Sequence, residues 1–274
     1  MEFQIVFCDV DGTLLNSSHE MLPGTLRAIR TLEARGIPFV IVSGRSPAGI
    51  EPIFKESGFR CPRICCNGAM MLDMEGRTVF SEGFSRETAG RVIQRMEEIP
   101  WECVWNLFTQ DQWIVKDRRN ACVALEESIV RVAAEEGGPD SVDASAAVGK
   151  IMGMCRAEDM DRIEAEMKRA FPELSIVRSS DTLLDVMQGG VSKSSAVKKA
   201  CELYRVPLRA AVAFGDQFND VQMLETVGMP FLMGNAPAEL KRRFSNITDS
   251  NDAEGICRAL EKLGLNIMNG EEAK

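Results

Sequence analysis

The sequence predicts an α/β protein in which a parallel-sheet core is interrupted by an inserted α+β domain. At both ends of the chain, short apolar segments typical of buried strands alternate with amphipathic helical segments. Between them, from about Gly83, the strands alternate apolar and polar residues, as in a sheet with one solvated face. We therefore expect a discontinuous core domain of residues 1–82 and 188–274, with residues 83–187 as the inserted domain.

The first part of the chain has the strand, helix, strand order of a parallel sheet with crossover connections. A helix begins at Pro23 and ends before Gly36, because proline suits the first helical position and glycine the end. Ser46 and Pro47 form a second helix start, an N-cap followed by proline. The strands predicted for this part, the last two as a hairpin, are 5–8, 37–42, 63–66, 70–72 and 78–80.

The inserted part contains all three tryptophans. Its first helix has Val92, Ile93 and Met96 on one face, at helical spacing. Further helices are predicted at 121–134 and 159–171. The strands predicted here are 101–105, 113–115, 150–154, 175–178 and 183–187.

The buried α/β pattern resumes at Lys193. The helices predicted there are 193–204, 217–225, 238–243 and 253–263. The strands predicted there are 210–214 and 229–233, which complete the parallel core.

Composition excludes several classes of function. A net charge of −9 and a pI near 4.9 argue against binding to nucleic acid or to an anionic membrane. The chain starts without a basic-then-apolar leader, and no apolar stretch approaches the roughly 20 residues that span a bilayer. Its nine cysteines are scattered and include no C-x-x-C pair, which favours a reduced, cytoplasmic protein without a zinc site. The sequence leaves the oligomeric state open, a monomer included.

Two carboxylates, Asp9 and Asp11, follow directly on the first strand and are followed by Gly12 and Thr13. In an open α/β sheet, ligands bind at the carboxyl ends of the strands. Two acids placed there repel each other and lose hydration, so their presence favours a bound cation.

The same pair of carboxylates also occurs in other kinds of loop. A capped, solvated loop is equally compatible with Asp9 and Asp11 taken alone. A calcium loop is rejected, because its sixth position needs glycine where this chain has Leu14, and a strand comes before it in place of a helix. The single histidine, His19, lies in a polar loop, which excludes histidine-based nucleophilic catalysis.

Polar residues end or follow the other core strands as well. They are Ser43, Asp216, Asn219 and Asp220, with Lys193 at a helix start. Each alone has an ordinary explanation, such as acids at a helix N-terminus or a solvated lysine. Together they meet the needs of phosphoryl transfer to water: a carboxylate nucleophile, an acid, ligands for Mg²⁺ and donors for phosphoryl oxygens.

The chain resembles the haloacid dehalogenase superfamily of phosphatases, and within it the Cof-type subfamily with a type IIB cap, over nearly its whole length. Four motifs carry this resemblance: Phe7–Thr13 (hydrophobics, then D-x-D-G-T), Ser43-Gly44-Arg45, Gly190–Lys193 and Gly215–Asp220 (G-D-x-x-N-D). Subfamily markers are Asn67-Gly68-Ala69, Met233–Ala236 and Thr248–Asp252 before Gly255. The resemblance implies a Rossmann-like core with an inserted cap domain.

The resemblance also implies roles for the acidic residues. Asp9 would be the nucleophile and a metal ligand. Asp11 would protonate the leaving group and then activate water, with its backbone carbonyl on the metal. Asp216 would bind Mg²⁺ directly, and Asp220 directly or through water.

The remaining implied site residues would contact the substrate. Ser43, Gly44 and Lys193 would bind phosphate, and Asn219 would help position phosphate or Lys193. Arg45 and Asn67 are candidates for contact with the substrate. The resemblance thus implies a Mg²⁺-dependent phosphatase of small phosphorylated metabolites, sugar phosphates first among them, acting through an aspartyl-phosphate. A phosphomutase or phosphotransferase, and a non-catalytic phosphometabolite-binding protein, remain alternatives.

Overall fold

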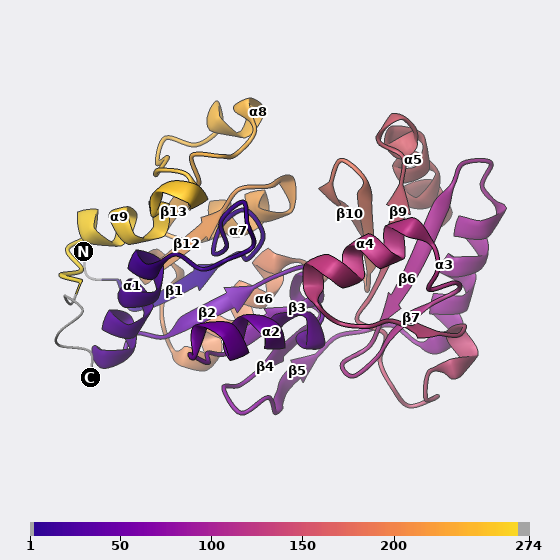
Figure 1. Ribbon diagram of the computed structural model, residues 1–274, viewed down its shortest axis with the longest axis horizontal. Coiled ribbons are helices and arrows are strands. Elements are labelled where there is room, and N and C mark those ends of the chain that lie inside the picture. Colours follow the sequence, from indigo (N-terminus) through magenta and orange to yellow (C-terminus); the bar gives the residue numbers. More distant parts are fainter. Residues whose placement is uncertain (1–2, 268–274) are drawn as a thin grey trace. The chain divides into compact units, whose positions relative to one another are not determined.

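The computed structural model describes residues 3–267, which divide into two compact units (Figure 1). The first contains the residues up to Ser43, Ser57–Arg63 and the residues from Lys193 on. The second contains Gly44–Glu56 and Ile64–Ser192. This division follows contacts between residues, and the domain boundaries expected after residues 82 and 187 stay a prediction.

The first unit is built on parallel strands, as the sequence predicts. β1 (Ile5–Cys8) pairs with β12 (Ala211–Gly215) on one side and β2 (Phe39–Val42) on the other, and β13 (Met229–Leu232) extends the sheet beyond β12. The order β13-β12-β1-β2 places β1 inside the sheet (Figure 1). Parallel strands are covered on both faces, which explains why β1, β2 and β12 are buried at every position.

Helices cover this sheet. They are α1 (Pro23–Ala34), α6 (Lys193–Tyr204), α7 (Val221–Thr226), α8 (Ala238–Lys241) and α9 (Gly255–Lys262). α1 packs against α9, and α6 against α7. The carboxylate of Glu254 accepts hydrogen bonds of 2.7 Å from the backbone N–H groups of Gly24 and Thr25, so the chain before α9 caps the start of α1.

The second unit contains a six-stranded sheet in the order β10-β11-β9-β6-β7-β8. Its strands are β6 (Cys103–Phe108), β7 (Trp113–Val115), β8 (Glu135–Glu136), β9 (Lys150–Cys155), β10 (Ser175–Ser180) and β11 (Leu183–Met187). All neighbours are antiparallel except β7 and β8. The apolar faces of α3 (Arg86–Glu98) and α5 (Met160–Ala170) pack on this sheet and form its core.

The rest of the second unit carries shorter elements. They are α2 (Pro47–Ser57), β3 (Arg63–Cys65), β4 (Met70–Leu72), β5 (Thr78–Ser81) and α4 (Ala121–Val130). β4 and β5 form the predicted hairpin.

The structure differs from the sequence prediction in local detail. The helix expected over 121–134 ends at Val130, because Arg131 adopts a left-handed conformation with φ of 57°. The residues that follow form β8, which the sequence pattern did not indicate. No helix within residues 3–267 is long and apolar enough to cross a membrane.

Candidate active site

Asp9 and Asp216 come together because the strands before them are parallel neighbours. Asp9 directly follows β1, and Asp216 directly follows β12. The backbone N–H of Asp9 donates to the carbonyl oxygen of Phe214 at 3.0 Å, which fixes the first carboxylate against the second strand. The carboxyl ends of both strands therefore present an acid at the same edge of the sheet.

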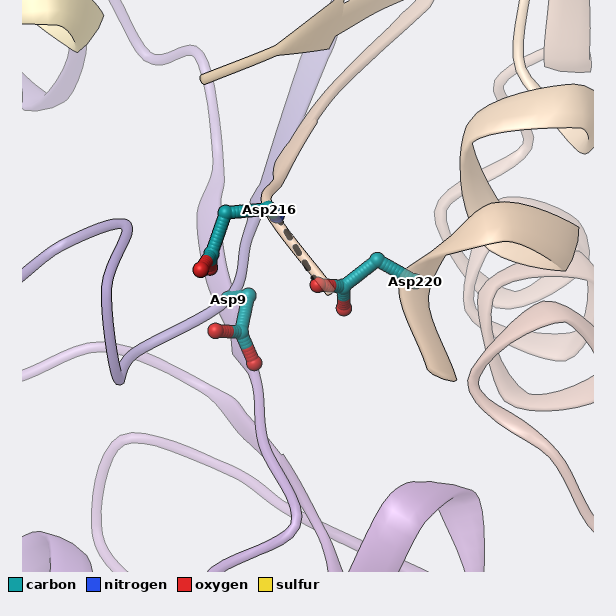
Figure 2. A group of neighbouring side chains, drawn as sticks. All are labelled: Asp9, Asp216 and Asp220. Carbon is teal, nitrogen blue, oxygen red and sulfur yellow. Dashed lines mark hydrogen bonds between the residues drawn. The ribbon is translucent and has the colours of Figure 1, made fainter. Parts of the chain in front are cut away.

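Asp220 completes a group of three buried carboxylates (Figure 2). Its Oδ2 atom accepts hydrogen bonds of 3.0 Å from the backbone N–H groups of Asp216 and Gln217, so the tight turn before α7 aims it back at the strand end. One carboxylate oxygen from each of Asp9, Asp216 and Asp220 lies within 4.8 Å of the other two. All three side chains are buried.

Lys193 is the cation of this group. Its Nζ atom lies 2.5 Å from Oδ1 of Asp9 and 2.5 Å from Oδ1 of Asp220. Burial lowers the pKa of Lys193, but the attraction of the two carboxylates outweighs it and raises the pKa overall. The ammonium is therefore held in its charged form.

For the acids, burial disfavours the charged form. Burial, together with the negative charge of Asp220, raises the pKa of Asp9 well above its ordinary value and that of Asp216 to about 7. When all three carboxylates are ionised beside the one ammonium, the buried group carries two net negative charges. A divalent cation balances that charge, and its preferred ligands are carboxylate oxygens. The residues present fit a divalent metal.

A second set of polar groups holds the carboxylate of Asp216. The Thr13 hydroxyl donates to Oδ1 of Asp216 at 2.7 Å. The Asn235 amide donates to the carbonyl oxygen of Gly12 at 2.8 Å and lies 3.4 Å from Oδ2 of Asp216. In turn, Oδ1 of Asn235 accepts a hydrogen bond from the backbone N–H of Asn251 at 3.1 Å. Sequence reasoning gave Thr13, Asn235 and Asn251 no role of their own, although all three lie in the quoted motifs.

Gly12 allows this close arrangement. Its φ is +79°, and a Cβ atom added there would lie 2.4 Å from Oδ2 of Asp216. Both the backbone conformation and the space require glycine. The G of D-x-D-G-T thus permits the loop after β1 to contact the acid after β12.

Asp11, in contrast to the three clustered carboxylates, is not buried. Its side chain is exposed, with 46% of its surface accessible, and Oδ1 lies 3.9 Å from Nδ1 of His19. His19 is itself largely exposed, in agreement with its expected polar loop. The two acids of the D-x-D pair therefore meet different surroundings, one buried beside Lys193 and one in contact with solvent.

The predicted phosphate-binding residues fall into two groups. Ser43 is buried directly after β2, the neighbour of β1, and Asn219 lies in the turn between Asp216 and Asp220. Both thus follow strands of the first unit at the carboxyl ends. Gly44 belongs to the second unit, where it is half-buried.

Arg45 and Asn67 also belong to the second unit. Arg45 donates from Nη1 to the carbonyl oxygen of Gly49 at 3.1 Å. Asn67 is buried, has a left-handed backbone with φ of 53°, and donates from Nδ2 to Oδ2 of Asp185 at 2.6 Å. Their expected contact with substrate stays a prediction.

Comparison with known proteins identifies the family. The sequence model of the haloacid dehalogenase-like hydrolases matches residues 6–260. A Haemophilus influenzae protein with a provisional phosphatase name is 35% identical over 262 residues, which cover 96% of this chain and 98% of that protein. The pyridoxal phosphate phosphatase YbhA of Escherichia coli K12 is 25% identical over 268 residues, or 94% of this chain and 97% of YbhA.

Solved structures show the same fold. A haloacid dehalogenase-like hydrolase from Bacteroides thetaiotaomicron superposes with a TM-score of 0.83 at 22% identity, covering 96% of this chain and all of that one. The subclass IIB sugar phosphatase BT4131 gives 0.82 at 19% identity, covering 96% and 99%. The fold is therefore the Rossmann-like core with an α+β cap that the sequence predicts.

The chain belongs to the haloacid dehalogenase-like hydrolase family. It is an enzyme, a phosphoric monoester hydrolase, in line with the named phosphatases among its relatives. The family generally uses a divalent metal, and this chain has a buried cluster of three acids at the strand ends.

Proposed function

We propose that the protein is a Mg²⁺-dependent phosphatase of small phosphorylated metabolites that acts through an aspartyl-phosphate on Asp9. One observation carries this proposal: the three buried carboxylates at the strand ends, with Lys193 between Asp9 and Asp220. A group of buried carboxylates beside one ammonium suits a negatively charged substrate that binds together with a cation.

The metal ligands in this proposal are Asp9, Asp216 and the backbone carbonyl of Asp11, with Asp220 as a ligand directly or through water. Mg²⁺ fits a site of few carboxylates that leaves coordination positions for water and substrate oxygen. Bound there, the ion would neutralise the acids and polarise the phosphoryl group.

Asp9 is the nucleophile in this mechanism. Its Oδ1 atom is bound by Lys193, which leaves Oδ2 to attack phosphorus. The new bond joins Oδ2 to phosphorus while the bond from phosphorus to the ester oxygen breaks, and the alkoxide leaves. Carboxylate nucleophiles that form such acyl phosphates are an established route.

Asp11 is the general acid and then the general base in this mechanism. Its carboxyl group gives a proton to the leaving alkoxide in the first step and, now ionised, accepts one from the attacking water in the second. Water then displaces phosphate from Asp9 and regenerates both acids. The exposed position of Asp11 supports this role, because the side chain can reach the leaving group and solvent in turn.

Donors to the phosphoryl oxygens complete the proposal. Ser43, Gly44, Lys193 and Asn219 would bind them, with the lysine as a point charge. Arg45 and Asn67 are proposed to contact the non-phosphate part of the substrate. The named relatives act on sugar phosphates and pyridoxal phosphate, so small phosphorylated metabolites of these kinds form the first set to test.

The first experiment compares Asp9→Asn and Asp11→Asn with p-nitrophenyl phosphate and Mg²⁺. Nitrophenolate leaves without a proton, so Asp11→Asn is expected to release it in a burst and to retain one phosphoryl group on Asp9, seen by mass spectrometry. Asp9→Asn is expected to give no burst and no phosphoenzyme. Turnover by Asp9→Asn, with its fold intact by circular dichroism, would overturn the nucleophile assignment.

A second experiment separates the alternatives. A screen of phosphorylated metabolites measures substrate consumed and inorganic phosphate released. Equal amounts support a phosphatase. Consumption without matching phosphate, with the phosphoryl group found on another hydroxyl, identifies a phosphomutase or phosphotransferase. Saturable binding without consumption identifies a binding protein.

A further inference from the structure

Cys103 and Cys155 face each other in the sheet of the second unit. Cys103 is the first residue of β6, Cys155 is the last residue of β9, and the antiparallel register pairs them directly. Their sulfur atoms lie 3.5 Å apart. No step of the proposed hydrolysis uses either thiol, so the pair calls for a separate explanation.

The backbone geometry of this pair suits a disulfide. The N–H of Cys155 donates to Thr182, on the β11 side of β9, so Cys155 turns its backbone polar groups away from β6. Cys103 and Cys155 are therefore a non-hydrogen-bonded pair, the kind whose Cα atoms lie about 4.5 Å apart. Disulfides join Cα atoms about 4.4–6.8 Å apart, so no strand has to move for the bond to form.

The neighbouring residue leaves room for the sulfur atoms. Gly153 lies two positions before Cys155 and therefore on the same face of the sheet. A Cβ atom added there would lie 2.7 Å from Sγ of Cys103 and 3.7 Å from Sγ of Cys155. Any larger residue would crowd Cys103, whereas glycine leaves space in which its sulfur can turn toward Cys155.

The pair is also within reach of solvent. Cys103 is half-buried, and Cys155, its partner on the neighbouring strand, is buried with 8% of its surface accessible. The adjacent residues Glu102 and Arg156 are exposed and form an ion pair of 3.4 Å across the same two strands. The thiol of Cys155 donates a hydrogen bond to the sulfur of Cys103, so the two sulfur atoms already contact each other.

A metal site does not account for the pair. Within residues 3–267, Asp9, Asp216 and Asp220 are the only group of three or more acidic, cysteine or histidine side chains close enough to share an ion. Zinc needs about four such ligands, and the two thiols have no third partner of this kind among the described residues.

We propose that Cys103 and Cys155 form a redox-active pair that closes reversibly into a disulfide on reaction with a hydroperoxide. The thiolate of one cysteine attacks the terminal peroxide oxygen, the O–O bond breaks, and the alkoxide takes a proton from water and leaves. The sulfur of the other cysteine then attacks the sulfenic acid sulfur, the S–O bond breaks, and water leaves with the thiol proton. The two thiols lose two electrons in total, which reduce the peroxide, and a dithiol reductant returns both thiols.

The experiment treats the protein with one equivalent of hydrogen peroxide. The expected result is the loss of two of the nine thiols, a peptide linking Cys103 to Cys155 in the non-reduced digest, and recovery of both thiols with dithiothreitol. Cys122→Ser serves as the matched control, because Cys122 is exposed and belongs to α4 and not to the two paired strands. That variant should still form the link.

Two single variants test whether both sulfur atoms are needed for the link. Cys103→Ser and Cys155→Ser should each lose the link while retaining the circular dichroism spectrum of the parent. The proposal is wrong if the treated parent loses other thiols while Cys103 and Cys155 remain open to alkylation. It is equally wrong if either sulfur accumulates as sulfinic acid without the link.

Discussion

The side-chain amide of Asn235 donates a hydrogen bond of 2.8 Å to the carbonyl oxygen of Gly12. This contact ties the loop after β13 to the loop after β1, two segments more than two hundred residues apart in sequence. The same amide nitrogen lies 3.4 Å from Oδ2 of Asp216, and the backbone of Asn251 holds its oxygen in turn. Asn235 therefore helps to hold the carboxylate of Asp216 in position, although Asn235 carries no acidic group itself.

Asn235→Ala is expected to weaken metal binding about 10- to 100-fold, the usual cost of removing a group that orients a metal ligand. Asp216 then loses one of its two side-chain donors, while the Thr13 hydroxyl remains. The measurement is a Mg²⁺ titration, read both by phosphatase activity and by the thermal unfolding midpoint. Asn246→Ala is the control, because Asn246 is exposed in the same unit and should titrate like the parent. An unchanged Mg²⁺ midpoint in Asn235→Ala would refute this role.

The sequence predicted the strand ends well, because the pattern of apolar runs followed by polar residues is local. Asp9, Asp216 and Asp220 meet as expected once β1 and β12 pair in parallel. What it could not predict is which side chains touch within the group. Lys193 donates hydrogen bonds to both Asp9 and Asp220 because of the way α6 packs beside the turn before α7. No periodicity in the sequence encodes this packing.

The same limit explains the residues that sequence reasoning passed over. Asn235 and Asn251 belong to quoted motifs, yet their partners are backbone atoms of distant loops. A hydrogen bond to a backbone carbonyl leaves no mark in the sequence of the acceptor. Cys103 and Cys155 are scattered in the sequence for a similar reason, because only the register of β6 and β9 brings them together.

Mg²⁺ is expected to stabilise the protein, and its removal by a chelator to abolish hydrolysis. Binding to the folded state alone contributes about 2.7 kcal/mol when the ion is a hundredfold above its dissociation constant. The check is the thermal unfolding midpoint with chelator and with Mg²⁺. Asp216→Asn removes one ligand charge and should lose most of the shift. An equal shift in Asp216→Asn would locate Mg²⁺ binding elsewhere in the chain.

Alkaline pH is expected to destabilise the fold partly through Cys61. Burial raises the pKa of this thiol to about 12, from an ordinary value of about 9. Between these pH values the unfolded chain has released a proton that the folded chain keeps, so the free energy of unfolding falls as pH rises. One thiol contributes about 1.4 kcal/mol per pH unit.

The measurement for Cys61 is urea unfolding between pH 9 and pH 11. Cys61→Ala should lose stability less steeply with pH than the parent, by the amount given for one thiol. Cys122→Ala is the control, because its side chain is exposed and its slope should equal that of the parent. Parallel slopes for Cys61→Ala and the parent would contradict the prediction.

Lys193→Met is expected to remove activity and to destabilise the metal-free protein by about 3–5 kcal/mol, the usual cost of removing one partner from a buried ion pair. The ammonium of Lys193 lies between Asp9 and Asp220, and its loss leaves two buried carboxylates without their cation. Urea unfolding in chelator measures the loss, and Lys198→Met, at an exposed position on α6, is the matched control. Since Mg²⁺ can neutralise the same acids, it should restore part of the stability of Lys193→Met but none of its hydrolysis. If Lys193→Met is as stable as Lys198→Met in chelator, the pairing of Lys193 with the two carboxylates does not hold in solution.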